Sequence, residues 1–403
     1  MNEDTKSKYK GNIFKINVLY VIAGFTLFFI PIAIFYYQYY GLSYFDIGLT
    51  AGIGLLATLL CEIPTGAFAD LYGRKKSVSM GLFLYLMGIL ILTFSSTLFY
   101  FIISSIVFGI GQAFLSGAWD ALMFDSLKAI KREKEYLKIS SRQQSLFLVV
   151  LVGSAFLAPY LYTKNIKYPY YVSIFFGVFL FLHSLTLFEI LPKKRKFAII
   201  EHIDQMKEGI NYVKKHNKII WIIIFTVISY CIDQIYQQLV GGPYILEKGF
   251  IIEQIGIVAF FSIILQTVAM NLSHTIEKKF KEKKAIMISF FGSILFFVLM
   301  YFSNKYTFIL ARGLAGGFIM MSMLILNNAL VHKLRKKIRA TVISIYSMVM
   351  SLFGIIAIAI AGIIIDKTSL QFLIMTMALT GLFFGIILLL IRYQKGIKEK
   401  FKF

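Results

Sequence analysis

Charged side chains are scarce in this sequence. They make up 15% of the 403 residues, against about 25% in a soluble globular domain, while 58% of the residues are hydrophobic. A chain of this composition cannot bury its apolar surface in a core of its own, so lipid must cover part of it. The composition therefore excludes a soluble enzyme.

The sequence also lacks the patterns of common reactive and cofactor sites. It has two cysteines, Cys61 and Cys231, both inside apolar runs, and five scattered histidines without the spacing of metal ligands. No phosphate-binding G-x-x-x-x-G-K-[ST] loop and no hydrolase nucleophile motif is present. We therefore expect no cofactor, no metal site and no enzymatic activity.

Short alternating segments, the signal of an outer-membrane barrel, are absent as well. The apolar runs are continuous and about 20 residues long, which is the length that a helix needs to cross a bilayer. No small-residue cleavage site follows the first run, so we interpret it as a retained span. The sequence predicts an all-α integral membrane protein with twelve transmembrane helices, over residues 14–37, 45–67, 77–95, 98–124, 142–162, 169–190, 218–240, 252–272, 285–303, 306–331, 341–365 and 370–391.

Positive charge is abundant, and its position decides what it means. The formal net charge is +22, a value that by itself would suit a nucleic-acid partner. If the N-terminus is cytoplasmic, 36 of the 42 Lys and Arg residues fall in inner segments and five in outer loops. This distribution is typical of membrane proteins. We expect a multi-pass protein of the plasma or inner membrane, surrounded by lipid, with both termini cytoplasmic and no nucleic-acid partner.

The longest interruption of the apolar pattern covers residues 191–217. It separates an N-terminal six-helix bundle, residues 1–190, from a C-terminal six-helix bundle, residues 218–403. Apolar residues recur within it at spacings of three and four, which predicts an amphipathic helix at the membrane surface: Phe197, Ile200, Ile203, Met206, Ile210 and Val213. We interpret the segment as a cytoplasmic linker, with a regulatory lever as the alternative.

A glycine-containing basic segment follows the second predicted span. It reads G-A-F-A-D-L-Y-G-R-K-K, with Gly66, Asp70, Gly73, Arg74, Lys75 and Lys76 as its polar and glycine positions. At the matching place after the eighth span, residues 274–284 read H-T-I-E-K-K-F-K-E-K-K, which keeps the length and the basic end but not the glycines. Two corresponding six-helix halves are typical of transporters built from parallel repeats.

The segment at residues 66–76 resembles the signature of the major facilitator superfamily in sequence and in place. Glu62-Ile63-Pro64-Thr65 and Arg339-Ala340-Thr341 are similar to a prokaryotic, drug-efflux-like branch of that superfamily. The resemblance implies two six-helix bundles that rock about a cavity lined by spans 1, 4, 7 and 10. It also implies that Asp70 faces the N-terminus of span 11, near Thr341.

The same segment predicts a cytoplasmic gate. Arg74 can pair with a carboxylate, and Asp125 at the inner end of span 4 is the candidate partner. With Asp70 at a helix N-terminus of the other half, this cluster would latch the two halves shut on the inside. The gating residues are then Gly66, Asp70, Gly73, Arg74, Lys75 and Asp125. The alternative is that these charges only set the topology.

Ionisable side chains inside the spans are few, and each is a functional candidate because its insertion costs about 2.5–3.5 kcal/mol. Glu62 and Asp120 lie at similar depths in spans 2 and 4. They could form a proton site, since two nearby carboxylates do not both ionise easily, or they could belong to the gate. Asp233 in span 7 and Arg312 in span 10 also match in depth. We predict that these two pair, as a substrate or proton switch or as a structural pair.

Polar and aromatic residues at cavity-facing positions are candidates for substrate contacts. We select six of them: Gln112, Trp119, Tyr230, Gln234, Gln237 and Asn327. An aromatic wall suits an apolar or cationic ligand. Each of these side chains could instead bond or pack against a neighbouring helix.

Together these features favour a secondary active transporter that works by alternating access, as a monomer. We expect efflux of a small amphipathic or cationic compound coupled to protons. Uptake of a polar nutrient such as a sugar, amino acid or metabolite is the first alternative. A protein that senses a ligand without transporting it is the second, and it would usually carry an extra soluble domain.

Overall fold

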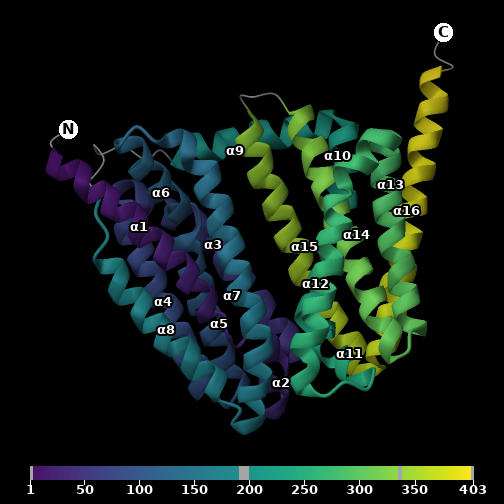
Figure 1. Cartoon of the computed structure of the whole chain (residues 1–403). Coiled ribbons are helices and arrows are strands. Elements are labelled where there is room, and N and C mark those ends of the chain that lie inside the picture. Colours follow the sequence, from purple (N-terminus) through teal and green to yellow (C-terminus); the bar gives the residue numbers. More distant parts are fainter. Residues whose placement is uncertain (1–2, 190–198, 335–337, 401–403) are drawn as a thin grey trace. The chain divides into compact units, whose positions relative to one another are not determined.

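The computed structural model describes residues 3–189, 199–334 and 338–400. Within these ranges every regular element is a helix, and twelve helical stretches are long and apolar enough to cross a membrane. The predicted all-α fold with twelve transmembrane helices is therefore confirmed (Figure 1). The chain forms two compact units. We call Met1–Ala198 with Ile251–Ile257 the N-terminal unit, and Ile199–Phe250 with Val258–Phe403 the C-terminal unit.

The N-terminal unit is a bundle of long helices. Ser43 and Asp46 form a capping box at the start of its third helix: each side chain accepts a hydrogen bond from the other residue's backbone N–H, at 3.1 Å. The helices are α1 (Glu3–Thr26), α2 (Ala33–Tyr39), α3 (Tyr44–Tyr72), α4 (Arg74–Phe94), α5 (Leu98–Leu115), α6 (Ala118–Ala129), α7 (Tyr136–Lys164) and α8 (Tyr168–Leu185).

Two spans of this unit that the sequence predicts as continuous helices are interrupted. Span 1 contains a 3₁₀ turn at Ile30–Ile32 between α1 and α2, because Pro31 cannot continue an α-helix. Span 4 breaks between α5 and α6, where Gly117 has φ 72° and ψ −33°. Residues that carry a Cβ seldom adopt this positive φ. The break positions the cavity described below.

The C-terminal unit has the same kind of architecture. Its tenth span starts at Asn304, whose Oδ1 accepts the N–H groups of Tyr306 and Thr307, each at 3.0 Å. Its seventh span contains a π-helical segment, η3, at Tyr236–Val240. The helices are α9 (Ile199–Lys215), α10 (Asn217–Ile235), α11 (Gly241–Glu247), α12 (Ile255–Asn271, from Val258 on in this unit), α13 (Ser273–Phe302), α14 (Lys305–Lys333), α15 (Arg339–Lys367) and α16 (Leu370–Lys400).

Helix α9 lies within the predicted segment 191–217 and packs on the start of α15. A Cβ added at Gly209 would lie 2.7 Å from Ile345 Cδ1 and 2.9 Å from Thr341 Cγ2, so the two helices touch there. Met206 and Val213 are half-buried and Ile210 is exposed. Phe197 lies outside the described residues, as do the side chains of Ile200 and Ile203.

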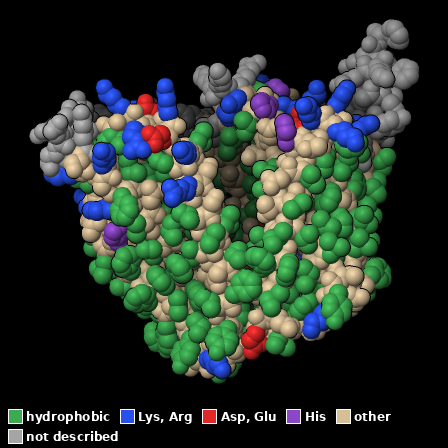
Figure 2. Space-filling view, in the orientation of Figure 1, with side chains coloured by type: hydrophobic (Ala, Val, Ile, Leu, Met, Phe, Trp, Pro, Cys, Tyr) green, Lys and Arg blue, Asp and Glu red, His purple; other side chains and the backbone are tan. Residues whose placement is uncertain are grey.

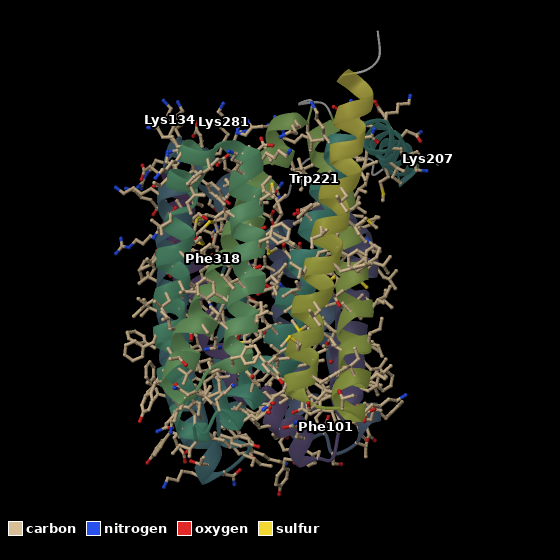
Figure 3. All side chains as sticks on the ribbon, turned by 90° about the vertical axis from the view of Figure 1, so that its right-hand side faces the viewer. Phe101, Lys134, Lys207, Trp221, Lys281 and Phe318 are labelled. Atoms are coloured by element: carbon tan, nitrogen blue, oxygen red, sulfur yellow. The ribbon has the colours of Figure 1, made fainter. Side chains whose placement is uncertain are left out.

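Each unit has a charged end and apolar sides. On the N-terminal unit, Lys and Arg gather at the end with the α6–α7 connection, and hydrophobic side chains cover the flanks (Figure 2). Lys134 and Phe101 mark opposite ends of this unit (Figure 3). On the C-terminal unit, Lys207 of α9 and Lys281 of α13 lie at one end, and Phe318 lies between the ends (Figure 3). This arrangement suits helices whose sides face lipid.

Candidate functional site

The turn between α3 and α4 consists of one residue, Gly73. Its N–H donates to the Ala69 carbonyl at 3.0 Å, which ends α3, and α4 begins at Arg74. Gly73 has φ 100° and ψ 151°. This region of backbone space is essentially restricted to glycine. The glycine of the predicted motif therefore has a conformational reason to stand at this position.

The first turn of α4 receives its cap from a distant residue. Gly73 has no side chain to accept the free N–H groups at the helix start. Glu189 supplies both oxygens instead: Oε1 accepts the N–H of Arg74 at 2.9 Å and Oε2 accepts the N–H of Lys75 at 2.7 Å. A carboxylate at this end of a helix is also favoured by the helix dipole. Glu189 thus fixes where the basic segment begins.

The Arg74 side chain extends from α4 toward α6. Its guanidinium forms an ion pair with Asp125, and Nη1 donates to the Ala121 carbonyl at 3.1 Å. The backbone of Arg74 is therefore held by Glu189 while its side chain is held on α6. The structure brings together these two candidates of the predicted gate.

The remaining gate candidates lie at the surface of the N-terminal unit. Gly66 and Asp70 are exposed on the last turns of α3, and Lys75 is half-buried. Within the described part of this unit, Asp70 makes no side-chain hydrogen bond or ion pair. The partner expected for Asp70, near Thr341, belongs to the C-terminal unit, so the gate as a whole stays a prediction.

A cavity of about 520 Å³ opens in the N-terminal unit at the break between α5 and α6. Its aromatic lining includes Tyr20, Tyr85, Trp119 and Phe147, and Asp120 is its carboxylate. Gln112 and Trp119, both predicted as substrate contacts, line it. Its size falls within the range of about 300–1,000 Å³ that is usual for small-molecule sites.

The structure gives Glu62 and Asp120 different surroundings. Asp120 is the third residue of α6 and faces the cavity. Glu62 is exposed on α3 and is not among the residues that line the cavity. The predicted carboxylate pair is therefore not assembled around this cavity, because the break in span 4 turns Asp120 toward α1 and α7.

A second, smaller cavity lies in the C-terminal unit, between α10, α12, α13 and α14. Its volume of about 10 Å³ is close to what one water molecule needs. Its polar lining consists of Asp233, Tyr236, Gln237, Gln266 and Arg312. The candidate coupling residues Asp233 and Arg312 thus face one enclosed space.

The predicted Asp233–Arg312 ion pair is not formed. Arg312 Nε donates to the Tyr236 hydroxyl at 2.7 Å, and Nη1 donates to the Ser262 hydroxyl at 3.0 Å. Asp233 Oδ1 accepts a long bond from Gln237 Nε2, at 3.5 Å. Tyr236 lies three residues after Asp233, on the same face of the helix, so its hydroxyl occupies the place beside Arg312 that the sequence assigns to the carboxylate.

The other predicted substrate contacts are dispersed. Gln237 lines the cavity of the C-terminal unit, but Gln234 and Tyr230 do not. Tyr230 packs on α15, where a Cβ at Gly354 would lie 2.9 Å from its Cε1. Asn327 is exposed near the end of α14. These three side chains therefore have no place in either cavity.

Sequence reasoning missed several residues of these sites. Tyr85, Phe147, Tyr236, Ser262 and Gln266 are uncharged residues inside apolar runs, where nothing in the pattern separates them from packing residues. Glu189 had a usable signal, since it is a carboxylate at the C-terminal end of predicted span 6, on the same side of the spans as the basic segment after span 2.

Comparison with curated proteins finds relatives without an assigned substrate. The chain is 24% identical over 265 residues to the uncharacterized MFS-type transporter YxaM of Bacillus subtilis (strain 168), covering 62% of this chain and 63% of that protein. It is 29% identical over 199 residues to the uncharacterized MFS-type transporter MJ1560 of Methanocaldococcus jannaschii, covering 48% and 50%. The chain thus spans less than two thirds of the length of these relatives.

Solved structures share the fold. A crystal structure of the nucleoside transporter NupG superposes with a TM-score of 0.78 at 13% identity, over 94% of this chain and 98% of that one. The D-xylose-proton symporter gives a TM-score of 0.68 at 12% identity, over 92% and 97%. The family model of the Major Facilitator Superfamily matches residues 16–241 and 240–402. With nearly its whole length matched, the chain belongs to the major facilitator superfamily.

Proposed function

We propose that the chain is a secondary active transporter that works by alternating access and exports a small amphipathic or cationic compound in exchange for protons. Membership of the superfamily supports alternating access between two repeats. The absence of an ATP-binding loop supports the use of a gradient. A monomer suffices, because the two six-helix repeats of one chain supply both moving halves.

The same proposal includes the membrane and the orientation. Positive charge concentrates in segments on one side of the spans, with 36 Lys and Arg residues against five on the other side. Such segments stay in the cytoplasm. Both termini are then cytoplasmic, in the plasma or inner membrane of the cell. The Arg74–Asp125 pair and the exposed Asp70 belong to a cytoplasmic gate in this arrangement.

The observation that carries the proton coupling is the cavity of the C-terminal unit. Asp233 and Arg312 face the same water-sized space, yet the described residues bond Arg312 to two hydroxyls and leave Asp233 with one long hydrogen bond. A half-buried carboxylate with so few partners can exchange a proton through a water molecule that fills this space. Asp233 is therefore our coupling residue, and Arg312 is its electrostatic neighbour.

Protonation of Asp233 would weaken the electrostatic attraction between Asp233 and Arg312 inside this cavity. The ionised carboxylate attracts the guanidinium of Arg312 strongly at low dielectric, whereas the neutral acid does not. Proton binding therefore favours the arrangement in which Arg312 stays on Tyr236 and Ser262, and proton release favours movement toward Asp233. A ligand or proton shifts a conformational equilibrium only through such a difference between states.

Uptake of a polar nutrient is the second candidate function. The polar set Arg312, Gln237 and Gln266 faces one cavity and would suit hydroxyl or carboxylate groups of a substrate. In this case the cavity, which is water-sized in this structure, would have to widen before a substrate could reach Arg312 beside the protonated Asp233. The direction of the driven flux separates the two candidates.

Proteoliposomes test the proposal directly. The membrane potential is clamped with potassium and valinomycin, the lumen is made acidic, and uptake of the fluorescent cation ethidium is recorded. Exchange for protons predicts accumulation of ethidium that a protonophore abolishes. Accumulation of a sugar, nucleoside or amino acid in vesicles with an alkaline lumen would replace efflux by uptake.

The matched variants are Asp233→Asn and Glu253→Gln. Glu253 is exposed in the loop before α12 and serves as the control. We expect Asp233→Asn to keep ethidium exchange without a gradient and to lose accumulation driven by the pH gradient. If Asp233→Asn accumulates ethidium as Glu253→Gln does, the coupling role of Asp233 is wrong.

A further inference from the structure

The break in span 4 creates two helix ends inside the N-terminal unit. Helix α5 ends at Leu115, α6 begins at Ala118, and Ser116 N–H still donates to the Gln112 carbonyl at 2.9 Å. Gly117, with φ 72°, redirects the chain between them. Irregular backbone at membrane depth is tolerated where it lines a cavity. Here it lines the cavity of about 520 Å³, because Ser116 and Gly117 are both part of the lining.

The charge of this cavity has one sign. Asp120 contributes a carboxylate, and none of the side chains that line the described cavity is Lys, Arg or His. Asp120 is the third residue of α6, where the helix N-terminus stabilises negative charge. Its side chain is exposed to the cavity. A ligand with a positive charge would be attracted here, and an anionic ligand would be repelled.

The aromatic side chains of this cavity are held in place. The rings of Tyr20 and Trp119 meet edge to face at 5.9 Å between centroids, and those of Tyr20 and Phe147 at 5.8 Å. The Tyr20 hydroxyl donates to Gln144 Oε1 at 2.6 Å. Rings fixed in this way bind an aromatic cation without losing much side-chain freedom.

Few hydrogen-bonding groups remain for a polyhydroxylated ligand. The hydroxyl of Thr26 already donates to the Ala23 carbonyl at 2.8 Å, and the hydroxyl of Tyr20 is taken by Gln144. Gln112 and Ser116 at the break, and Tyr85 on α4, are the other lining side chains with an uncharged amide or hydroxyl group. A sugar would leave most of its hydroxyl groups without partners, which is unfavourable.

We infer that this cavity is the binding site for an organic cation that carries an aromatic ring system, with the positive charge near Asp120 and the rings among Tyr20, Trp119 and Phe147. The inference rests on the proposed function, because it names the substrate class of the transporter. It assigns substrate recognition to the N-terminal unit, whereas the proposed proton coupling uses Asp233 in the C-terminal unit.

The chain offers an internal reporter for this site. It has two tryptophans, Trp119 in the cavity wall and Trp221 in α10. A Trp221→Phe background leaves Trp119 as the only source of indole fluorescence. Titration of this purified variant in detergent with ethidium should give a saturable change of Trp119 emission. Phosphatidylglycerol nanodiscs repeat the titration without any cationic lipid headgroup that could occupy the site.

Variants of Asp120 and Phe147 separate the contribution of the negative charge to ligand binding from that of the aromatic wall. In the same background, Asp120→Asn should weaken ethidium binding about tenfold, the loss expected for one charge-assisted contact. Asp120→Glu should bind nearly as the parent does, and Glu253→Gln should not differ from it. Phenanthridine, the uncharged parent ring, should bind the parent and Asp120→Asn equally. Phe147→Leu tests the ring wall and should weaken both ligands severalfold.

The outcomes separate this inference from the proposed function. Equal ethidium affinities of parent, Asp120→Asn and Phe147→Leu overturn the cation site, even if ethidium is still transported by proton exchange. Binding that depends on Asp120, together with no flux driven by a pH gradient, supports the site and overturns the proposed exchange. If Asp120→Asn does not fold, unchanged binding by Phe147→Leu is sufficient to overturn the inference.

Discussion

The segment after span 2 and the segment after span 8 differ in sequence but repeat one design. Gly73 has φ 100° and ψ 151°, and Lys281, at the equivalent place of the second repeat, has φ 63° and ψ 156°. In the N-terminal unit Arg74 pairs with Asp125 of span 4. In the C-terminal unit Glu282 pairs with Lys333 of span 10, at 2.5 Å. The turn and the ion pair recur, with the two charges exchanged.

The features that both segments share are the structural part of the motif. Both repeats place a residue of positive φ directly before the charge that reaches the next span. Gly73 separates α3 from α4, whereas Lys281 forms a kink inside α13. Only the N-terminal repeat uses glycine for the turn and keeps the exposed Asp70. The turn and the ion pair, which both repeats have, organise each bundle. The glycine and the exposed Asp70, which only the N-terminal repeat has, are the candidates for gating.

The largest effect on stability should come from replacing Gly73, in the turn after span 2, by lysine, the residue at the equivalent place after span 8. Gly73→Lys forces a side chain into a conformation that costs about 1–3 kcal/mol for residues other than glycine. We expect a clearly lower melting temperature in detergent. Gly66→Ala is the matched control, because a Cβ at Gly66 meets no atom within 4 Å. Equal melting temperatures of the two variants would contradict the strained geometry.

The reverse substitution should have a smaller effect of opposite sign. Lys281→Gly removes the strain at φ 63°, but glycine also gains freedom in the unfolded chain. The balance predicts stabilisation of about 1 kcal/mol, measured as a higher melting temperature. Lys279→Gly, in the helical turn before it, should destabilise instead. A loss of stability in Lys281→Gly would mean that the turn is not strained.

The smallest effect should come from exchanging charges. The side chains of Arg74 and Asp125 are 30% and 50% exposed, and those of Lys333 and Glu282 are 29% and 44% exposed, so each pair contributes about 0–1 kcal/mol. Arg74→Glu with Asp125→Lys gives the first pair the charges of the second. A double-mutant cycle on thermal unfolding should show that the double variant recovers stability lost in each single variant. Purely additive losses would mean that the pair is not energetically coupled.

Much of the fold follows from the sequence, for physical reasons. Apolar runs of about 20 residues leave a helix as the only spanning structure, since every backbone polar group must be satisfied within lipid. The interruptions inside the spans are harder to foresee. In the sequence Gly117 cannot be distinguished from a glycine that only allows close helix packing. Its positive φ redirects the helix, and hydrophobicity along the chain carries no sign of this change.

The candidate sites were predictable only in part. Charges could be placed at matching depths, which brought Asp233 and Arg312 to one cavity. Depth alone does not indicate which neighbouring side chain forms a hydrogen bond with Arg312. In the structure the Tyr236 hydroxyl accepts this hydrogen bond. The aromatic wall around Asp120 draws on four separate helices, α1, α4, α6 and α7, and such a set has no signature along the chain.

The cap on α4 also imposes an order in time. Glu189 follows Arg74 by 115 residues, which takes a ribosome roughly 6–23 s to add at 5–20 residues per second. Until then the N–H groups of Arg74 and Lys75 lack the acceptor that they have in the folded unit. The N-terminal unit is therefore completed late in its own synthesis. Only then can Glu189, which follows α8, cap the start of α4.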